Sequence, residues 1–301
     1  MITITLEQAK VIEFDRASVA LGTFDGLHAG HIALIDAAKK HCGDTVAFTF
    51  DALPVDLFRS HHKPMQLFTM QEKIAAFERT DIDYLCVTHF DKSFAGMGKL
   101  DFEKLLVDYF SPVNVIAGYN YTYGHHAEGT AEMLRVDGAL LGYNVEVIPE
   151  VLVNEIPVSS TKIRECLWDG QIETANNLLG YNYSMSGTVV HGKGIGRTLG
   201  FPTANISVAK EKIVPKNGVY SVDVLVGEEK LRGVCSVGVN PTIEKHAHRT
   251  IEAHILDFDR DIYNEVIFVS FKRRIRDEIR FDSTMQLSEQ IQKDIDAANL
   301  Q

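Results

Sequence analysis

The sequence has no long apolar stretch, few cysteines and no excess of positive charge, and each shortage excludes a class of protein. No run approaches the roughly 20 apolar residues of a membrane-spanning helix, and residues 1–5 lack the basic start of a secretory signal. The four cysteines lie far apart, which fits neither a metal-binding pair nor a disulfide scaffold. A net charge of −11 argues against a nucleic-acid partner. These shortages predict a cytoplasmic protein with reduced thiols.

The chain does contain enough material for about two domains, since it has 301 residues of which 45% are hydrophobic. In its first half, apolar runs alternate with helical patterns, which predicts a doubly wound parallel sheet with ligands at the carboxyl ends of its strands. The expected strands are 17–21, 45–50, 83–88, 113–117 and 144–149, and the expected helices are 31–41, 70–79, 101–109 and 130–141.

After a helical stretch over 161–179 the sequence pattern changes from alternating strands and helices to short strands alone. We therefore expect one domain over 1–182 and a second over 183–301. Short strands separated by glycine and asparagine turns then favour a small antiparallel β-barrel, which leaves no exposed strand edge. The expected strands are 184–190, 218–226, 230–239, 249–257 and 264–271, followed by an amphipathic helix over 283–300.

The most specific string of the chain is GKGIGRTLGFPTANI at residues 192–206. Gly192, Gly194 and Gly196 remove the Cβ atoms that would keep the backbone away from a bound polyanion, and Arg197 follows as a fixed cation. The string therefore predicts a loop that binds the phosphates of a nucleotide. A glycine-rich hairpin without a ligand is the alternative.

Two neutral oxygen ligands close this string. Thr203 and Asn205 lie two residues apart, so their side chains share one side of an extended segment. Mg²⁺ keeps most of its waters and takes few protein ligands, so the pair suits a Mg²⁺ ion that arrives with a nucleotide.

A second string, GTFDGLHAGH at residues 22–31, lies between a short strand and a helical pattern. Such a loop points backbone N–H groups and the positive end of a helix dipole at a phosphate. The two histidines suit the stabilisation of charge on an α-phosphate as pyrophosphate leaves, although two unrelated loop histidines are the alternative. The residues assigned to this site are Gly22, Phe24, Asp25, His28, Gly30 and His31.

Two further segments carry polar residues that suit chemistry. Ser159, Ser160 and Arg164 begin a helical stretch and can bind phosphates, although serines at a helix start are also common as caps. In the strand 249–257, Glu252 lies on the face opposite the isoleucines. A carboxylate among apolar neighbours is costly unless it is paired or lies in a pocket, so Glu252 is a candidate for a functional role, and a solvent-facing side chain is the equal alternative.

The two strings resemble known signatures. Residues 192–206 closely resemble the signature of riboflavin kinases, and residues 22–31 resemble the H-x-G-H nucleotidyltransferase signature in its bacterial FAD synthetase form. In this order they resemble the bifunctional riboflavin kinase/FMN adenylyltransferase family over nearly the whole chain. The resemblance implies a C-terminal kinase that converts riboflavin to FMN with MgATP, and an N-terminal transferase that converts FMN and ATP to FAD and pyrophosphate.

The resemblance also implies roles for single residues. The segment 249–257 is similar to a kinase motif whose glutamate, here Glu252, accepts the proton of the ribityl 5′-hydroxyl. Residues 158–164 look like an element that binds the β- and γ-phosphates of ATP, and residues 238–242 match a family loop. The flavin-binding residues implied by the resemblance are Asn120, Arg280 and Phe281, and a core aromatic is the equal alternative for Phe281.

The chain departs from the family pattern in its first half. Ala52 and Leu53 stand where most relatives have a proline and a histidine, and His125 and His126 replace the usual basic residue. These departures leave open a kinase whose N-terminal domain is a weakened transferase or acts on another substrate. A flavin-binding regulatory protein without activity is a second alternative.

Overall fold

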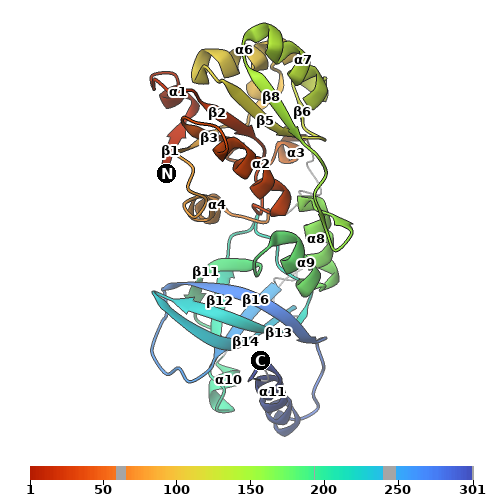
Figure 1. The fold of residues 1–301 in the computed structure, drawn as a ribbon. Coiled ribbons are helices and arrows are strands. Elements are labelled where there is room, and N and C mark those ends of the chain that lie inside the picture. Colours follow the sequence, from red (N-terminus) through yellow and green to blue (C-terminus); the bar gives the residue numbers. More distant parts are fainter. Residues whose placement is uncertain (59–65, 193, 240–248, 300–301) are drawn as a thin grey trace. The chain divides into compact units, whose positions relative to one another are not determined.

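A computed structural model describes residues 1–58, 66–192, 194–239 and 249–299. Its contacts divide the chain into one unit over Met1–Ser160 and a second over Thr161–Gln301 (Figure 1). The contacts group residues 161–182 with the second unit. The domain boundary expected near residue 182 remains a prediction. Part of the expected family loop, residues 240–242, lies outside the described residues.

The first unit contains a parallel sheet of six strands in the order β1-β4-β3-β2-β5-β8. The order reverses at β2, so the carboxyl ends of β2 and β5 border the crevice where open α/β sheets bind ligands. The five expected strands are confirmed, and β1 was missed because four alternating residues are a weak signal. The strands are β1 (Ile2–Thr5), β2 (Ser18–Leu21), β3 (Thr45–Phe50), β4 (Tyr84–Thr88), β5 (Asn114–Gly118) and β8 (Asn144–Ile148).

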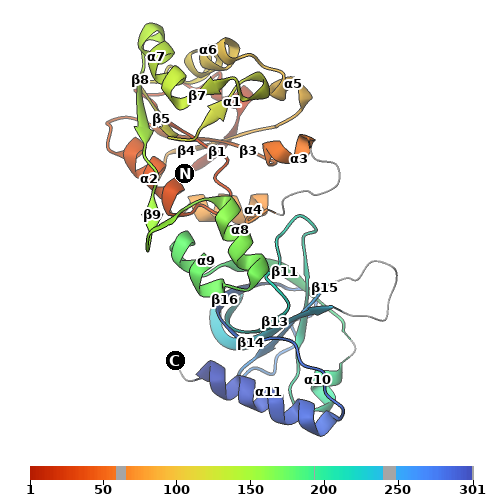
Figure 2. The same cartoon turned by 90° about the vertical axis from the view of Figure 1, so that its right-hand side faces the viewer.

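Helices cover both faces of this sheet, as the alternating pattern predicts (Figure 2). Phe102 and Leu106 of α6 and Leu134 of α7 pack on one face, against Val19 and Phe48. Helices α2 and α4 lie on the other face (Figure 2). The helices are α1 (Leu6–Ala9), α2 (Ala29–Lys39), α3 (Pro54–Phe58), α4 (Met70–Phe77), α5 (Lys92–Ala95), α6 (Lys99–Phe110) and α7 (Ala131–Leu141).

Two short hairpins and a single helical turn complete the first unit. Strands β6 (Thr122–Tyr123) and β7 (Gly129–Thr130) pair with each other, and the 3-10 turn η1 (His125–Ala127) connects them. Strands β9 (Leu152–Val153) and β10 (Ile156–Pro157) form the second pair.

The helical stretch expected over 161–179 is two helices, α8 (Ser160–Asp169) and α9 (Ile172–Leu179). Gly170 separates them because its φ of +78° is a left-handed conformation that glycine adopts without strain. A Cβ at this position would also lie 2.8 Å from Nε of Arg274, so the glycine permits close packing against the barrel.

The second unit is a closed barrel in the order β11-β12-β15-β14-β13-β16, and β16 pairs with β11 to complete it. The expected strands are confirmed, β11 and β13 with the same bounds and the other three with shifted ends, and the short strand β12 and helix α10 were missed. The elements are β11 (Ser184–Val190), α10 (Ile195–Thr198), β12 (Ala204–Val208), β13 (Gly218–Val226), β14 (Glu229–Val239), β15 (Arg249–Ile255), β16 (Val266–Arg276) and α11 (Thr284–Asn299).

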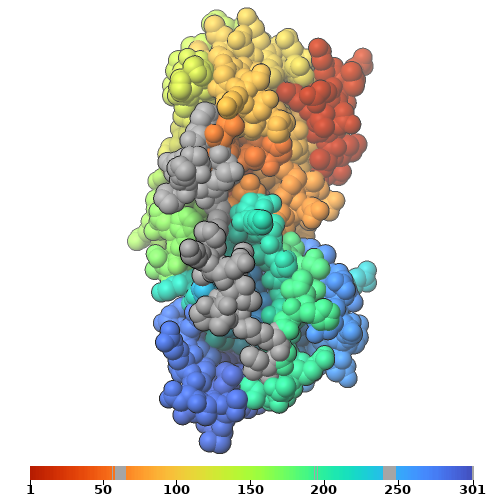
Figure 3. All heavy atoms as spheres, turned by 180° about the vertical axis from the view of Figure 1, so that it is seen from behind, coloured from red at the N-terminus to blue at the C-terminus, as the bar shows by residue number. Residues whose placement is uncertain are grey.

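The C-terminal helix α11 packs on the barrel wall. Ile295 and Ala298 join a buried cluster with Val219 and Val234, and the helix forms an outer face of this unit (Figure 3). Strand β16 extends to Arg276, five residues beyond the expected end, because its arginines find partners: the Arg276 guanidinium donates to the carboxylate of Asp294 at 2.6 Å.

Two expectations from composition can be compared with the structure. All four cysteines are free thiols, of which Cys42 is exposed and the other three are buried. Within the described part of the chain, no helix is both long enough and apolar enough to cross a membrane.

Candidate active sites

The H-x-G-H loop connects β2 to α2 and brings both histidines to the helix N-terminus. His28 is the N-cap of α2, and its Nδ1 accepts a hydrogen bond from the backbone N–H of His31 at 3.3 Å. The two imidazole rings stack with their centroids 3.6 Å apart and their planes 13° apart. Helix α2 therefore begins at Ala29, two residues earlier than expected, and its positive end faces the same space as both rings.

Two residues of the same string shape the loop from behind. Phe24 has a φ of +48° and is fully buried, and its ring would lie 3.2 Å from a Cβ placed at Gly22. The carboxylate of Asp25 accepts hydrogen bonds from the backbone N–H groups of Leu67 and Phe68, both at 3.0 Å. The expected phosphate-binding role of Phe24 and Asp25 remains a prediction.

A pocket of about 610 Å³ opens at this edge of the sheet, as expected for an open parallel sheet. The sequence-predicted residues that line it are Gly22, His28, Gly30, His31, Asn120, Ser159 and Ser160. Arg164 is not among the lining residues: it lies in α8, in the second unit, and is buried.

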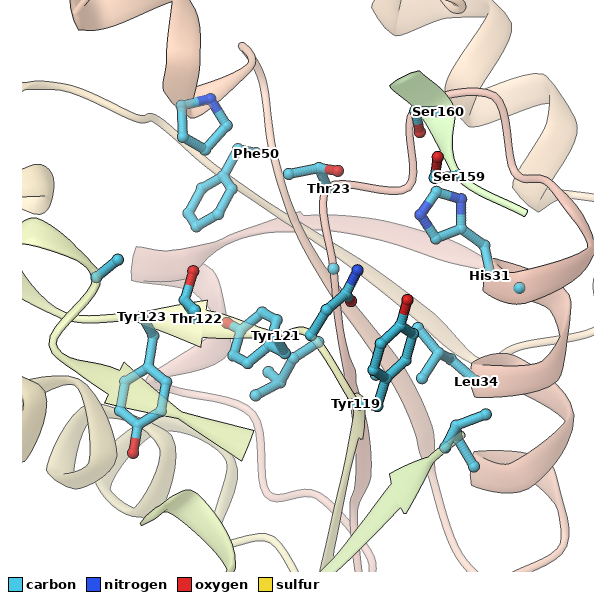
Figure 4. Close-up of a pocket in the computed structure, with 18 of the residues that line it drawn as sticks. Thr23, His31, Leu34, Phe50, Tyr119, Tyr121, Thr122, Tyr123, Ser159 and Ser160 are labelled. Carbon is cyan, nitrogen blue, oxygen red and sulfur yellow. The ribbon is translucent and has the colours of Figure 1, made fainter. Parts of the chain in front are cut away.

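The two ends of this pocket differ in chemistry. Ser159 and Ser160 lie beside His31 at one end, whereas Phe50 and Tyr123 lie toward the other (Figure 4). The polar end offers imidazoles, hydroxyls and a helix N-terminus, which suit phosphates. The other end suits a planar aromatic ring system. The aromatic lining consists of Phe50, Phe90, Phe94, Phe102, Tyr119, Tyr121 and Tyr123.

Sequence reasoning missed a buried lysine behind this pocket. Nζ of Lys73 donates hydrogen bonds to the carbonyl oxygens of Thr23 at 2.9 Å and Phe50 at 3.0 Å, and both of these residues line the pocket. Burial lowers the pKa of Lys73 to about 8, although the carboxylates of Asp25 and Asp51 oppose this change. A lysine in an amphipathic helix ordinarily predicts a surface position, so no sequence signal identifies it.

The two departures from the family pattern occupy different places. Leu53 is 7% exposed and precedes α3, and its neighbour Pro54 lines the pocket. His126 lines the pocket itself and packs against the ring of His125 at 3.9 Å. The apolar side chain at position 53 therefore belongs to the core, whereas His126 is placed where a ligand can reach it.

In the second unit, Glu252 lies in the middle of β15 with Asn205 of β12 opposite it on one side and Ser236 of β14 on the other. The hydroxyl of Thr203 donates to Oε2 of Glu252 at 3.3 Å. Glu252 is half-buried, whereas Ile251 on the opposite face is buried, which confirms the expected alternation. The barrel thus brings the expected base beside the two expected metal ligands.

The glycine loop lies directly against these ligands. A Cβ at Gly192 would lie 2.2 Å from Nδ2 of Asn205, and a Cβ at Gly196 would lie 2.4 Å from the carbonyl oxygen of Phe201. Gly194 has a φ of +70°, and Arg197 is exposed on α10. Each of the three positions therefore favours glycine for a steric or conformational reason. The loop backbone approaches the Thr203–Asn205 pair more closely than side chains would allow.

These ligands fit Mg²⁺ by their chemistry. A hydroxyl, an amide oxygen and a carboxylate are hard oxygen donors, and few protein ligands suffice because Mg²⁺ keeps waters and phosphates. No group of three or more histidine, cysteine, aspartate or glutamate side chains suited to a metal ion occurs among the described residues.

The expected flavin residues of the barrel follow β16. Phe281 is half-buried under the guanidinium of Arg276, which lies 6.0 Å from the centre of its ring, and Arg280 is exposed. Oε1 of Glu278 would lie 2.4 Å from a Cβ at Gly238, so this segment contacts the end of β14. The segment therefore borders the strand next to β15, which carries Glu252.

Family models match both halves of the chain. One described as riboflavin kinase matches residues 179–300, and one described as FAD synthetase matches residues 11–162. A bifunctional riboflavin kinase/FMN adenylyltransferase of Buchnera aphidicola subsp. Schizaphis graminum is 36% identical over 288 residues, which cover 93% of this chain and 92% of the relative. The chain belongs to this family. It is an enzyme with a riboflavin kinase domain and an FAD synthetase domain.

A second relative matches nearly the whole chain, and one solved structure matches all of it. The Bacillus subtilis bifunctional riboflavin kinase/FMN adenylyltransferase is 36% identical over 297 residues, which cover 96% of this chain and 91% of the relative. A crystal structure titled macrolide-efflux protein from Streptococcus pneumoniae has a TM-score of 0.90 and 32% identity, with 100% of both chains covered. The fold is therefore shared from end to end.

Proposed function

We propose that this enzyme phosphorylates riboflavin to FMN at the Thr203–Asn205–Glu252 cluster and adenylylates FMN to FAD in the pocket of the first unit, with ATP as the second substrate of each reaction. One observation supports the proposal: the predicted residues of each reaction lie together within one unit, His28, His31, Ser159 and Ser160 around the pocket and Thr203 hydrogen-bonded to Glu252 in the barrel. The two reactions therefore need no shared residue.

In the barrel, the ribityl 5′-oxygen of riboflavin attacks the γ-phosphorus of ATP, the bond from that phosphorus to the leaving oxygen of ADP breaks, and Glu252 takes the hydroxyl proton. The glycine loop and Arg197 hold the phosphates, since phosphoryl transfer depends chiefly on placement and charge neutralisation. Thr203 and Asn205 would hold Mg²⁺, which neutralises phosphate charge when bound. Hydrogen bonding to Thr203 fixes the Glu252 carboxylate in one orientation.

In the first unit, an oxygen of the FMN phosphate attacks the α-phosphorus of ATP, and the bond to the β-phosphate breaks with release of pyrophosphate. His28 and His31 stabilise the charge that develops on the α-phosphate, together with the N-terminus of α2. Ser159 and Ser160 bind the departing phosphates. No covalent intermediate on the protein is required.

The flavin ring occupies the aromatic end of the pocket, and the amide of Asn120 hydrogen-bonds to its polar edge. The lining supports this assignment, because its phenylalanine and tyrosine rings match a planar fused ring system. The four unpaired thiols support a reducing compartment, so we assign the enzyme to the cytoplasm.

One assay tests the proposal. Purified enzyme is incubated with MgATP and either riboflavin or FMN, and the three flavins are resolved by chromatography. We expect Glu252→Gln to lose FMN formation by about 10²–10⁴-fold but to adenylylate supplied FMN normally. We expect His28→Ala with His31→Ala to show the reverse, while His41→Ala, a surface control on the same unit, loses neither activity.

Three outcomes would contradict the proposal. Equal loss of both activities in either variant argues for a shared site or a folding defect. A wild type that makes FMN only supports a weakened or redirected transferase domain. A wild type that makes neither product, yet binds flavin, supports the regulatory alternative.

A further inference from the structure

A carboxylate that neither reaction uses lies fully buried behind the aromatic end of the pocket. Glu103 of α6 is 0% exposed, and its Oε1 accepts a hydrogen bond from the hydroxyl of Tyr123. Tyr123 lines the pocket. The buried glutamate is therefore connected to the pocket wall through one phenol.

The charged groups around Glu103 do not neutralise it fully. Nζ of Lys99 lies 3.8 Å from Oε1, but Lys99 also forms an ion pair with Asp137. Oε2 of Glu103 and the hydroxyl of Tyr143 are both buried, and in the described ranges neither has a hydrogen-bond partner. Burial raises the pKa of Glu103. Such a site costs stability relative to an apolar side chain, so the glutamate needs a further reason.

The Tyr123 ring is held on its other sides by close packing. A Cβ at Gly129 would lie 2.6 Å from the ring, so only glycine leaves room for it there. The centre of the Phe102 ring lies 5.1 Å from the centre of the Tyr123 ring. The Tyr121 ring is stacked on the Tyr123 ring, with the two centres 5.9 Å apart and 20° between the planes. Tyr121 also lines the pocket. The hydroxyl of Tyr123 is thus fixed by Glu103, and its ring supports the Tyr121 ring.

We infer that Glu103 is a positioning residue of the first unit: it fixes Tyr123, and through it Tyr121, as the stacked wall that receives the flavin ring. This inference rests on the proposed adenylylation of FMN. Glu103 acts only through the Tyr123 hydroxyl, so a change at either residue alters flavin binding and leaves the polar end, which binds ATP, unchanged.

Four variants test the inference in the full-length enzyme: Glu103→Leu, Glu103→Gln, Tyr123→Phe, and Glu103→Leu combined with Tyr123→Phe. Asp108→Asn, an exposed change on the same helix, is the matched control. The readouts are the KM for FMN, the KM for ATP and the kcat of adenylylation. The kinase rate of the second unit reports whether the rest of the chain is intact.

We expect Glu103→Leu and Tyr123→Phe each to raise the KM for FMN about tenfold, with the KM for ATP and the kinase rate unchanged. Glu103→Gln keeps an acceptor and stays within about threefold of the wild type. In the Tyr123→Phe background, Glu103→Leu adds no further increase, because the pair acts as one unit.

Several results would overturn the inference. Independent, additive effects of the two changes would show that Glu103 does not act through the hydroxyl, and an equal rise in both KM values would show a general loss of structure. If Glu103→Leu does not fold, Tyr123→Phe alone tests the inference, and an unchanged KM for FMN in that variant contradicts it. If the wild type makes no FAD, the adenylylation proposal fails separately. In that case FMN binding, measured by the quenching of its fluorescence, tests the stacked wall. The variants differ from one another only in the first unit, so a difference in FMN affinity between them arises there.

Discussion

Replacing Lys73 by methionine isolates the cost of burying a charge behind the transferase pocket. The side chain is 5% exposed, and its ammonium group donates to two backbone carbonyls that border the pocket. Methionine has a similar length but no charge, so Lys73→Met removes the burial penalty together with these hydrogen bonds. The hydrogen-bond loss is expected at every pH, whereas the penalty depends on whether the amine carries its proton.

The sign and size of the pH effect on stability follow from the pKa of Lys73, which burial lowers from 10.5 to about 8. Below about pH 8 the folded and unfolded states both carry the proton, and the folded state bears the full penalty. Above about pH 10.5 neither state carries it, and the penalty is absent. At about 1.4 kcal/mol per pKa unit, the wild type gains about 3 kcal/mol relative to Lys73→Met as the pH rises through this window.

Urea unfolding at pH 7 to 11 measures this difference. Far-UV circular dichroism follows both units, whereas the single tryptophan, Trp168, lies in the second unit and reports that unit alone. Lys104→Met, an exposed change in the first unit, is the control and should run parallel to the wild type at every pH. If the Lys73→Met and wild-type curves also run parallel between pH 8 and 10.5, the lysine is not buried as a charge and the reasoning is wrong.

Two further predictions concern the two sites. Replacing Thr203 with valine and Asn205 with leucine together should raise the Mg²⁺ concentration that the kinase needs and leave adenylylation of supplied FMN unchanged; a parallel shift of both activities in a magnesium titration would contradict separate sites. Leu53→His should not increase FAD synthesis, because position 53 is buried in the core, and it should destabilise the first unit by about 1–3 kcal/mol. Faster FAD synthesis at unchanged thermal stability would show that the missing histidine matters.

Much of the fold could be predicted because its strands are apolar runs bounded by turn residues. The run 45–50 became β3 with the same bounds, since a strand buried on both faces needs no polar alternation. The short strand β12 was hidden inside a motif that was interpreted for its chemistry. The break at Gly170 was missed because its reason, the approach of Arg274, depends on a strand about 100 residues away.

The residues of the candidate sites also differ in whether their role depends on local sequence or on distant partners. Residues whose role depends on local spacing, such as His28 and His31, could be found in the sequence. Lys73 and Glu103 could not, because their partners lie 50 and 20 residues away and a charged residue on a helix ordinarily indicates a surface. The hydrogen bonds of Asp25 could not be predicted from its string either, because its carboxylate accepts from backbone N–H groups 42 and 43 residues away.

The pairing of β11 with β16 has a consequence for how the chain is synthesised. The sheet of the first unit is complete once Ile148 has left the ribosome, so that unit can fold while the rest is still being made. The barrel cannot close during synthesis in this way, because its first strand, β11, pairs with its last strand, β16, which ends at Arg276. Until then β11 and β13 each present an unpaired edge. A chain that stops before residue 266 is therefore expected to release a folded first unit attached to an aggregation-prone remainder.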